Sequence, residues 1–311
     1  QNPGIIIQTG NKDKVSESLD KNGISYFRIA RPVPERMLFI TKRDQKIKLD
    51  IDKLRDKWFR TSYLLDRRQS GNNLAKERYD TYAANKICFV TGNFKGTYGS
   101  LGISPVKQIK SSTRAAIIRE KGVNGDREMA YALFLSGFEV KDIHMTDLVS
   151  GRETLEDINM IVFVGGFSNS DVLGSAKGWA GAFMYNPKAK GALNKFYKRD
   201  DTLSLGVCNG CQLMAELGLI YPEHDEKPKL LHNKSQKFES SFLGVKILKS
   251  NSVMLGNMAG MELGIWIAHA EGRFRLPYSE ERYNIPLKYS GHTYPANPNG
   301  SDHNIAALCS S

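Results

Sequence analysis

The feature that most constrains this chain is the stretch Gly206–Gln212, which reads Gly-Val-Cys-Asn-Gly-Cys-Gln. It follows an apolar run at 203–207 and leads into a helical pattern at 210–217. A tight turn between a buried strand and a helix needs small residues two positions before and after its central residue, because larger side chains there would collide. The stretch therefore predicts a strand–turn–helix unit that presents Cys208 at the carboxyl end of a sheet.

The rest of residues 114–311 repeats this alternation of strand and helix. Each expected strand is a short continuous apolar run, which is typical of strands buried on both faces. We therefore predict an α/β fold, with a mostly parallel open sheet covered by helices on both faces, and a region richer in strands after residue 218. The expected strands are 115–118, 138–145, 160–164, 203–207, 245–248, 264–269 and 287–289, and the expected helices are 127–136, 179–197 and 210–217.

The sequence before this domain divides into two segments. Residues 1–50 form a small α+β fragment that is too short to bury a core alone. Residues 51–113 form a connector, in which a helical pattern is followed by a glycine-rich stretch that we expect to be an extended linker. The expected elements are strands at 4–8, 24–29 and 37–41, helices at 13–22 and 52–82, and the linker at 85–112.

The charge of the chain is concentrated in this first part. The formal net charge is +11, and residues 1–114 hold 23 Lys and Arg against 11 Asp and Glu. Acids are interspersed with these bases and no nucleic-acid-binding signature accompanies them, so we expect a solvated or domain-docking surface and no nucleic-acid partner. No apolar run approaches the roughly 20 residues of a membrane span, and four cysteines are too few for a disulfide scaffold. We expect a cytoplasmic protein with no membrane partner.

Cys208 is the expected nucleophile. At the amino end of a helix its thiolate would be favoured by the helix dipole. A buried, inert cysteine is one alternative, and a redox pair with Cys211, in a C-x-x-C spacing, is another. Upstream, Gly165-Gly166-Phe167 follows an apolar strand and offers an uncluttered backbone whose N–H groups could hold an oxyanion. An ordinary glycine-rich turn is the alternative for that segment.

These residues carry a family resemblance. The stretch 206–212 with Gly165-Gly166-Phe167 upstream resembles the class I, triad-type glutamine amidotransferase domain, which implies a flavodoxin-like α/β fold. The match is closer to the phosphoribosylformylglycinamidine synthase family in its large single-chain form. Segment 58–68 resembles the connector of that family, and residues 1–50 resemble the end of its synthetase part, a ferredoxin-like α+β domain. The further matching blocks are 119–125, 165–168, 171–174, 269–273 and 294–300.

The resemblance implies a function in purine biosynthesis. Cys208 would attack the side-chain amide of glutamine and form a thioester that water hydrolyses. Gly165, Gly166, Phe167, Asn209 and Gln212 would hold the oxyanion and the substrate. The ammonia would serve the synthetase part, which would bind ATP and Mg and convert formylglycinamide ribonucleotide to formylglycinamidine ribonucleotide. A non-catalytic docking fragment of the same enzyme is the alternative.

A thiol nucleophile needs a base and a group that orients the base. The resemblance implies that both come from a His-Pro-Glu motif near the carboxyl end, and this sequence contains no such motif. We therefore expect the chain to stop before its catalytic pair and to have weak activity or none. His269 and Glu271 have the same His-x-Glu spacing, and we expect them to line the pocket wall or to substitute as base. No histidine has metal-ligand spacing with a cysteine, so we expect no cofactor or metal in this chain.

Overall fold

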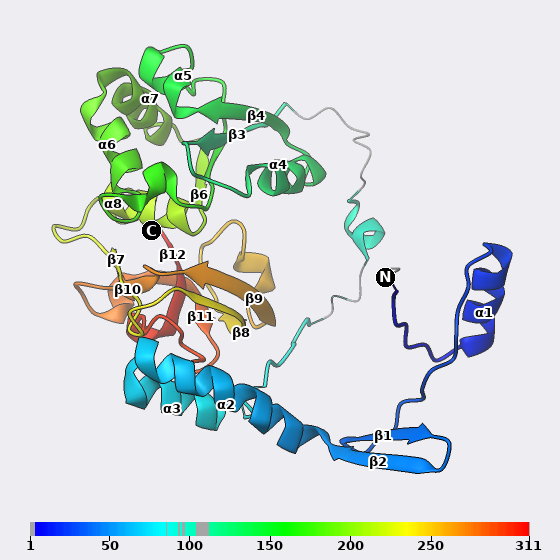
Figure 1. Cartoon of the computed structure of the whole chain (residues 1–311). Helices are drawn as coiled ribbons and strands as arrows, with labels where there is room; N and C mark the ends of the chain where they lie inside the picture. Colours follow the sequence, from blue (N-terminus) through cyan, green and yellow to red (C-terminus); the bar gives the residue numbers. More distant parts are fainter. Residues whose placement is uncertain (1–3, 85, 93, 95–96, 104–111, 311) are drawn as a thin grey trace. The chain divides into compact units, whose positions relative to one another are not determined.

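The computed structural model describes residues 4–84, 86–92, 94, 97–103 and 112–310 of the chain (Figure 1). The chain separates into two compact units, Gln1–Arg60 and Thr61–Ser311, which are taken in turn below. The described residues contain no helix that is both long enough and apolar enough to cross a membrane.

The described part of the first unit holds one helix, one β-hairpin and the start of a second helix. Helix α1 (Lys12–Lys21) starts at Asn11, whose side chain accepts a hydrogen bond from the Lys14 N–H, and it ends before Gly23 at a φ of +65°. Strands β1 (Met37–Lys42) and β2 (Gln45–Asp50) pair antiparallel. The predictions of strands at 4–8 and 24–29 are wrong. Both segments are apolar, but no neighbouring strand pairs with them among the described residues, and Ile5 is 89% exposed.

The expected helix over 52–82 is two helices. Helix α2 (Ile51–Gln69) and helix α3 (Gly71–Thr81) are separated at Ser70. The next residue, Gly71, has a φ of +77°. A residue in this left-handed region ends a helix, and glycine adopts it without steric cost. Of the expected linker, the described part contains a short 3₁₀ turn, η1 (Tyr98–Leu101), and an isolated bridge from Val90 to Glu262; the remainder lies outside the described residues.

The second unit contains the parallel sheet that the sequence predicts. Its strands are β3 (Arg114–Arg119), β4 (Glu139–His144), β5 (Met160–Phe163) and β6 (Leu203–Gly206). They run parallel in the order β4-β3-β5-β6 (Figure 1). The order reverses between β3 and β5, and the loops that follow these two strands are hydrogen-bonded to each other, with an isolated bridge between Val123 and Gly166.

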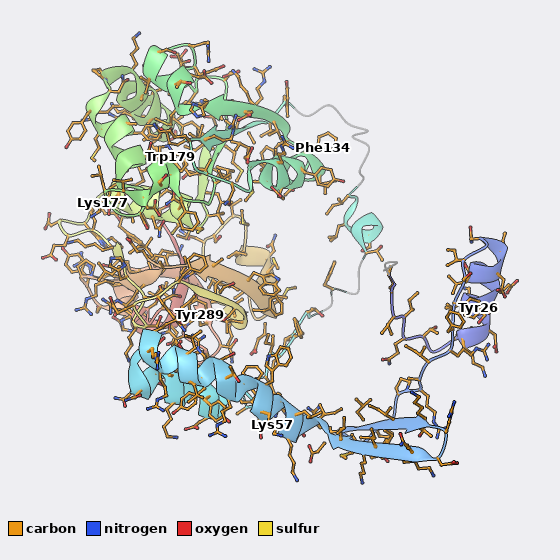
Figure 2. The ribbon with its side chains drawn as sticks, viewed as in Figure 1. Tyr26, Lys57, Phe134, Lys177, Trp179 and Tyr289 are labelled. Atoms are coloured by element: carbon orange, nitrogen blue, oxygen red, sulfur yellow. The ribbon has the colours of Figure 1, made fainter. Side chains whose placement is uncertain are left out.

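Helices cover both faces of this sheet, because successive strand residues point to opposite sides. On one face, Ile118 and Phe163 pack against Trp179 and Phe183, and the Phe163 ring meets the edges of both aromatic rings at about 6 Å (Figure 2). On the other face, Ile117 packs in a cluster with residues of helix α4. The covering helices are α4 (Asp126–Leu135), α5 (Met145–Ser150), α6 (Lys177–Tyr185), α7 (Pro187–Tyr197) and α8 (Asn209–Glu216).

The predicted single helix over 179–197 is interrupted between α6 and α7. Pro187 has no N–H to donate to the preceding turn, so α6 stops and a new helix starts there. Asn186 caps that start, because its side-chain oxygen accepts a hydrogen bond from the Ala189 N–H at 2.9 Å.

The strand-rich region forms sheets of its own. Strands β8 (Glu239–Ile247), β9 (Glu262–His269), β11 (Asn284–Tyr289) and β12 (Ile305–Cys309) make an antiparallel sheet in the order β12-β11-β8-β9. Strands β7 (Lys229–Leu231) and β10 (Arg273–Arg275) form a separate pair. Short 3₁₀ turns connect the elements: η2 (Ser168–Asp171), η3 (Gly256–Met258), η4 (Glu280–Arg282) and η5 (Asp302–Asn304).

We expect Gly210 to be indispensable to this packing. A Cβ at Gly210 would overlap the backbone carbonyl of Phe163 on β5, whereas a Cβ at Gly191, inside α7, would meet nothing within 4 Å. Gly210→Ala should lower the free energy of unfolding by at least about 3 kcal/mol. Gly191→Ala, the matched control, should raise it by about 1 kcal/mol because alanine favours a helix interior. Chemical denaturation of both variants measures this, and equal stability would contradict the close approach of α8 to β5.

Candidate active site

The turn between β6 and α8 holds Cys208 in an unusual backbone conformation, with φ 52° and ψ −111°. A non-glycine residue in such a region costs about 1–3 kcal/mol and persists only where its surroundings enforce it. Here the surroundings are close: a Cβ at Gly206 would lie 2.6 Å from the Gly210 carbonyl oxygen. The predicted strand–turn–helix unit is confirmed, and its two glycines are required by contact between backbones.

The Cys208 thiol is half-buried between two loops. Its Sγ donates a hydrogen bond to the carbonyl of Ala268 at 3.6 Å, and the backbone N–H groups of Gly166 and Asn209 donate toward the sulfur. Burial raises the pKa of Cys208 above its ordinary value and outweighs these two donors, and the charge of Asp171 adds to the rise. The N–H of Asn209 at the start of α8 does favour the thiolate, but desolvation of the thiolate is the larger effect, so the pKa of Cys208 is raised.

The Gly165–Phe167 segment lies against the nucleophile. A Cβ at Gly165 would come 3.3 Å from that of Cys208. Gly166 has a φ of +124°, and a Cβ there would lie 2.5 Å from the Cα of Val123, with which Gly166 forms an isolated bridge. The Gly166 N–H can therefore approach Cys208 only with glycine at this position. The ring of Phe167 lies 6.2 Å from that of Phe238.

The side chains of Asn209 and Gln212 are fully engaged within the protein. Asn209 is completely buried; its oxygen accepts from the Ser168 N–H at 3.1 Å, and its nitrogen donates to the Gln212 side-chain oxygen at 3.0 Å and to Asp171 at 3.4 Å. The Gln212 nitrogen donates to the Glu271 carbonyl at 2.7 Å. These amides join the loop after β5, helix α8 and the turn after β9. Contact of either with substrate stays a prediction.

His269 and Glu271 have separate partners. The Nε2 of His269 hydrogen-bonds to the side chain of Asn299, and burial lowers the pKa of His269. The carboxylate of Glu271 lies 3.8 Å from Nδ1 of His232. A base and its orienting carboxylate must contact each other and the nucleophile. The recorded contacts of these two side chains among the described residues include neither each other nor Cys208.

A cavity of about 700 Å³ lies beside the nucleophile, and Cys208 does not line it. Gln212 and Glu271 line this cavity, and so do Lys177, Lys227, Lys229 and Arg273, so its wall is rich in cationic side chains. In the described part of the chain, no three His, Cys, Asp or Glu side chains gather in a way that could hold a metal ion.

Cys211 does not resemble a redox partner of Cys208. Both are free thiols in the structure. Burial raises the pKa of Cys211 to about 12, and its side chain packs against an apolar cluster that includes Ile220 and Tyr221. A reactive thiol is usually one whose pKa is depressed.

Sequence reasoning missed three residues that shape the site. Asp171, in the matching block 171–174, accepts hydrogen bonds from Ser175 and the Ala176 N–H. Asn233 and Asn299 are completely buried and hydrogen-bond to each other at 2.8 Å beside His269. The sequence of a polar loop does not indicate which of its residues is buried. The only signal for Asp171 and Asn299 was that they lie in the segments 171–174 and 294–300, which resemble the family.

Most of the chain is similar in sequence to part of several large synthases. It is 38% identical over 272 residues to the phosphoribosylformylglycinamidine synthase of Drosophila melanogaster, with 82% of this chain and 20% of that protein covered. It is 40% identical over 280 residues to the probable chloroplastic/mitochondrial synthase of Arabidopsis thaliana (83% and 19% covered) and 39% identical over 286 residues to the human synthase (84% and 21% covered). The chain spans about a fifth of the length of these relatives.

A solved structure and a family model also match much of the chain. The structure of PurLQS from Thermotoga maritima is 28% identical with a TM-score of 0.51, and the match covers 64% of this chain and 82% of that chain. The expected fold class is confirmed. The family of CobB/CobQ-like glutamine amidotransferase domains matches residues 112–311, which include Cys208, the glycine segment at 165–166 and His269. Since this match covers more than half of the chain, the chain belongs to the family of CobB/CobQ-like glutamine amidotransferase domains.

Proposed function

We propose that this chain is the glutaminase part of a phosphoribosylformylglycinamidine synthase, with Cys208 as its nucleophile. One observation carries the proposal: Cys208 sits in a strained strand-to-helix turn, and two backbone N–H groups, of Gly166 and Asn209, converge on its sulfur. Acyl transfer to a thiol needs this arrangement, because the carbonyl oxygen of the substrate becomes an oxyanion next to the attacking sulfur.

The proposed reaction has two halves. The Cys208 sulfur attacks the side-chain amide carbon of glutamine, its proton passes to the leaving nitrogen, and ammonia departs to leave a γ-glutamyl thioester. Water then attacks the thioester, releases glutamate and returns the proton to the sulfur. The N–H groups of Gly166 and Asn209 hold the oxyanion in both halves. Gly165 and Phe167 shape the loop on one side of the bound glutamine, and Gln212 helps to hold the substrate on the other side.

The raised pKa of Cys208 means that the thiol needs a base near neutral pH. The ring of His269 faces Asn299, and Glu271 faces His232, which supports a role for both as wall residues. We therefore propose that the base and its orienting carboxylate are a His-x-Glu pair from outside the described residues, and that this chain alone turns over glutamine weakly or not at all.

In the whole enzyme, the ammonia would be used by the synthetase part with ATP and magnesium to make formylglycinamidine ribonucleotide in purine biosynthesis. The relatives that bear this name support this wider role. We propose a cytoplasmic location, with glutamine and the synthetase part as partners and with neither nucleic acid nor membrane; the name of the Arabidopsis relative assigns that protein to chloroplast or mitochondrion. A docking fragment without turnover remains the alternative for this chain in isolation.

The proposal predicts glutamine-dependent ammonia release that depends on Cys208. We expect little release from this chain and clear release from a longer form that carries any native residues beyond position 311. Cys208→Ala in the longer form should reduce release by at least about a thousandfold, because loss of a nucleophile removes the whole covalent route. Cys88→Ala, at an exposed cysteine, is the control and should leave release unchanged.

Equal ammonia release from both forms would contradict the proposal that the base lies outside the described residues. His269 would then be the first candidate for the base. Release that survives Cys208→Ala in the longer form would contradict the nucleophile. Folded protein without release from either form would favour the docking alternative.

We also expect Gly166 to act on turnover rather than on glutamine binding. The added Cβ of Gly166→Ala would meet the Cα of Val123 and displace one of the two oxyanion donors. Turnover in the longer form should fall about a hundredfold to a thousandfold with a small change in KM. Gly125→Ala, also at a positive φ but in open space, is the control for backbone strain. Equal losses in both variants would show that strain alone is responsible.

A further inference from the structure

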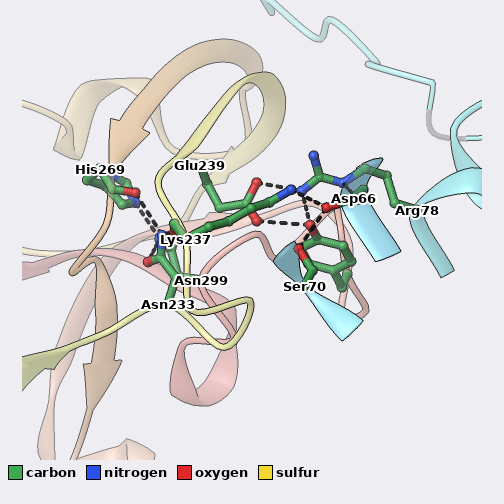
Figure 3. A network of polar contacts seen from close by, with 9 residues as sticks. Asp66, Ser70, Arg78, Asn233, Lys237, Glu239, His269 and Asn299 are labelled. Carbon is green, nitrogen blue, oxygen red and sulfur yellow. Dashed lines mark hydrogen bonds and ion pairs between the residues drawn. The ribbon is translucent and has the colours of Figure 1, made fainter. Parts of the chain in front are cut away.

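A buried cluster of charged groups holds the connector helices to the antiparallel sheet (Figure 3). The Asp66 carboxylate on α2 pairs with Lys237, and Ser70 donates a hydrogen bond to it at 2.7 Å. Arg78 on α3 pairs with Glu239 at 2.5 Å. The Asp66 side chain is only 9% exposed and that of Glu239 only 1%, so these are ion pairs inside the protein rather than on its surface.

Both oxygens of Glu239 are hydrogen-bonded, whereas Oδ2 of Asp66 and Nε of Arg78 have no hydrogen bond and form only an ion pair with each other at 3.6 Å. Tyr294 donates a hydrogen bond to the second oxygen of Glu239 at 2.9 Å, and the guanidinium of Arg78 lies 4.7 Å from the centre of the Tyr294 ring. Burial opposes the ionisation of Asp66, but the hydrogen bonds from Lys237 and Ser70 and the charge of Arg78 outweigh it and hold its pKa below the ordinary value. Buried charges of this kind fix geometry strongly, because breaking one pair leaves its partner unpaired.

Asn233 joins this cluster to the turn that follows β9. Its side-chain nitrogen donates to the Lys237 carbonyl at 3.0 Å and to the His269 carbonyl at 2.7 Å. Its oxygen accepts from the Gly272 N–H at 3.1 Å and from Asn299. One completely buried amide therefore spans from the segment that carries Lys237 to both ends of the 269–272 turn.

Two carbonyl groups, that of Ala268 at the end of β9 and that of Glu271 in the turn, accept hydrogen bonds from Cys208 and from helix α8. The carbonyl of Ala268 accepts the hydrogen bond from the Cys208 sulfur at 3.6 Å. The carbonyl of Glu271 accepts from Gln212, one helical turn further along α8, at 2.7 Å. Contacts thus lead from Asp66 to Cys208 through the ammonium of Lys237, the side chain of Asn233 and the carbonyls of His269 and Ala268. The side chain of Lys237 and the backbone between residues 268 and 269 join these contacts covalently.

We propose that Asp66, Lys237 and Asn233 are positioning residues, which hold the 268–272 turn against Cys208 and thereby make the burial of the thiol depend on the docking of the connector helices. A partner that moves α2 and α3 would change the burial of the Cys208 thiol through these contacts. The inference rests on the proposed role of Cys208, but its test reads the thiol and not glutamine turnover, so the two can fail separately.

The test measures the pH dependence of iodoacetamide alkylation at Cys208 by peptide mass spectrometry, with exposed Cys88 as the reference for accessibility. The variants are Asp66→Asn and Lys237→Met. Asp80→Asn is the matched control, because it removes a carboxylate from α3 whose side chain is 51% exposed and pairs with Lys76. Thermal unfolding checks that each protein is folded.

We expect both Asp66→Asn and Lys237→Met to lower the pH midpoint of Cys208 alkylation by about half a unit or more, which is about a threefold faster reaction below the midpoint. The reason is that a loosened turn lets water reach the sulfur and reduces the cost of forming the thiolate. The charged and titratable groups that face Cys208, Asp171 from the loop after β5 and Cys211 on α8, are the same in every variant. Asp80→Asn should leave the midpoint unchanged.

The two variants separate positioning from a direct effect of charge. Removing a negative charge stabilises a thiolate and removing a positive charge destabilises it, so direct electrostatics predicts shifts of opposite sign for Asp66→Asn and Lys237→Met, both weakened by salt. Opposite shifts would overturn the proposal, as would unchanged midpoints in folded variants. If Lys237→Met does not fold, Ser70→Ala removes only the hydroxyl bond to Asp66, and it must lower the midpoint while Asp80→Asn does not.

Discussion

The close approach of helix α8 to strand β5 is the constraint on which the site depends. Gly210 leaves no room for a Cβ beside the Phe163 carbonyl, and Gly206 leaves none beside Gly210. The chain can then pass from strand to helix only if Cys208 takes its strained conformation. The strain is held by the packed core behind it, where Phe163 meets Trp179 and Phe183. Sheet packing thus determines where the sulfur points.

Two opposed effects act on the pKa of the Cys208 thiol in this position. The Gly166 and Asn209 N–H groups favour negative charge, whereas burial and the nearby Asp171 carboxylate disfavour it, and burial prevails. Donors of this kind cannot stabilise much charge on a resting thiol, but they would stabilise the oxyanion of the proposed reaction next to it. The arrangement suits a group that becomes nucleophilic only while a base removes its proton.

Much of this could be read from the sequence, and the failures have definite causes. The strands of the parallel sheet and the turn at Cys208 were predicted because apolar runs and paired glycines are local signals. The strands expected at 4–8 and 24–29 fail because a strand needs a partner, which an apolar run alone does not specify. The raised pKa of Cys208 could not be foreseen, because burial of the thiol depends on tertiary packing of segments that lie far apart in sequence. The Asn233 network joins residues 36 and 66 positions apart, and no periodicity marks such contacts.

The burial of the thiol has a consequence for the proposed role as a glutaminase, whose product is ammonia. A cysteine that was already ionised would hydrolyse glutamine whenever it bound, and the ammonia would be lost if no acceptor was ready. A protonated, half-buried thiol avoids this, since its reaction waits for a base to be brought into contact. In this chain the carbonyl of Ala268 holds the proton of that thiol, and Asn233 anchors the neighbouring turn to the segment on which the connector helices dock. Under the proposed function, the segments that contact Cys208 are therefore linked to the surface on which the connector helices pack.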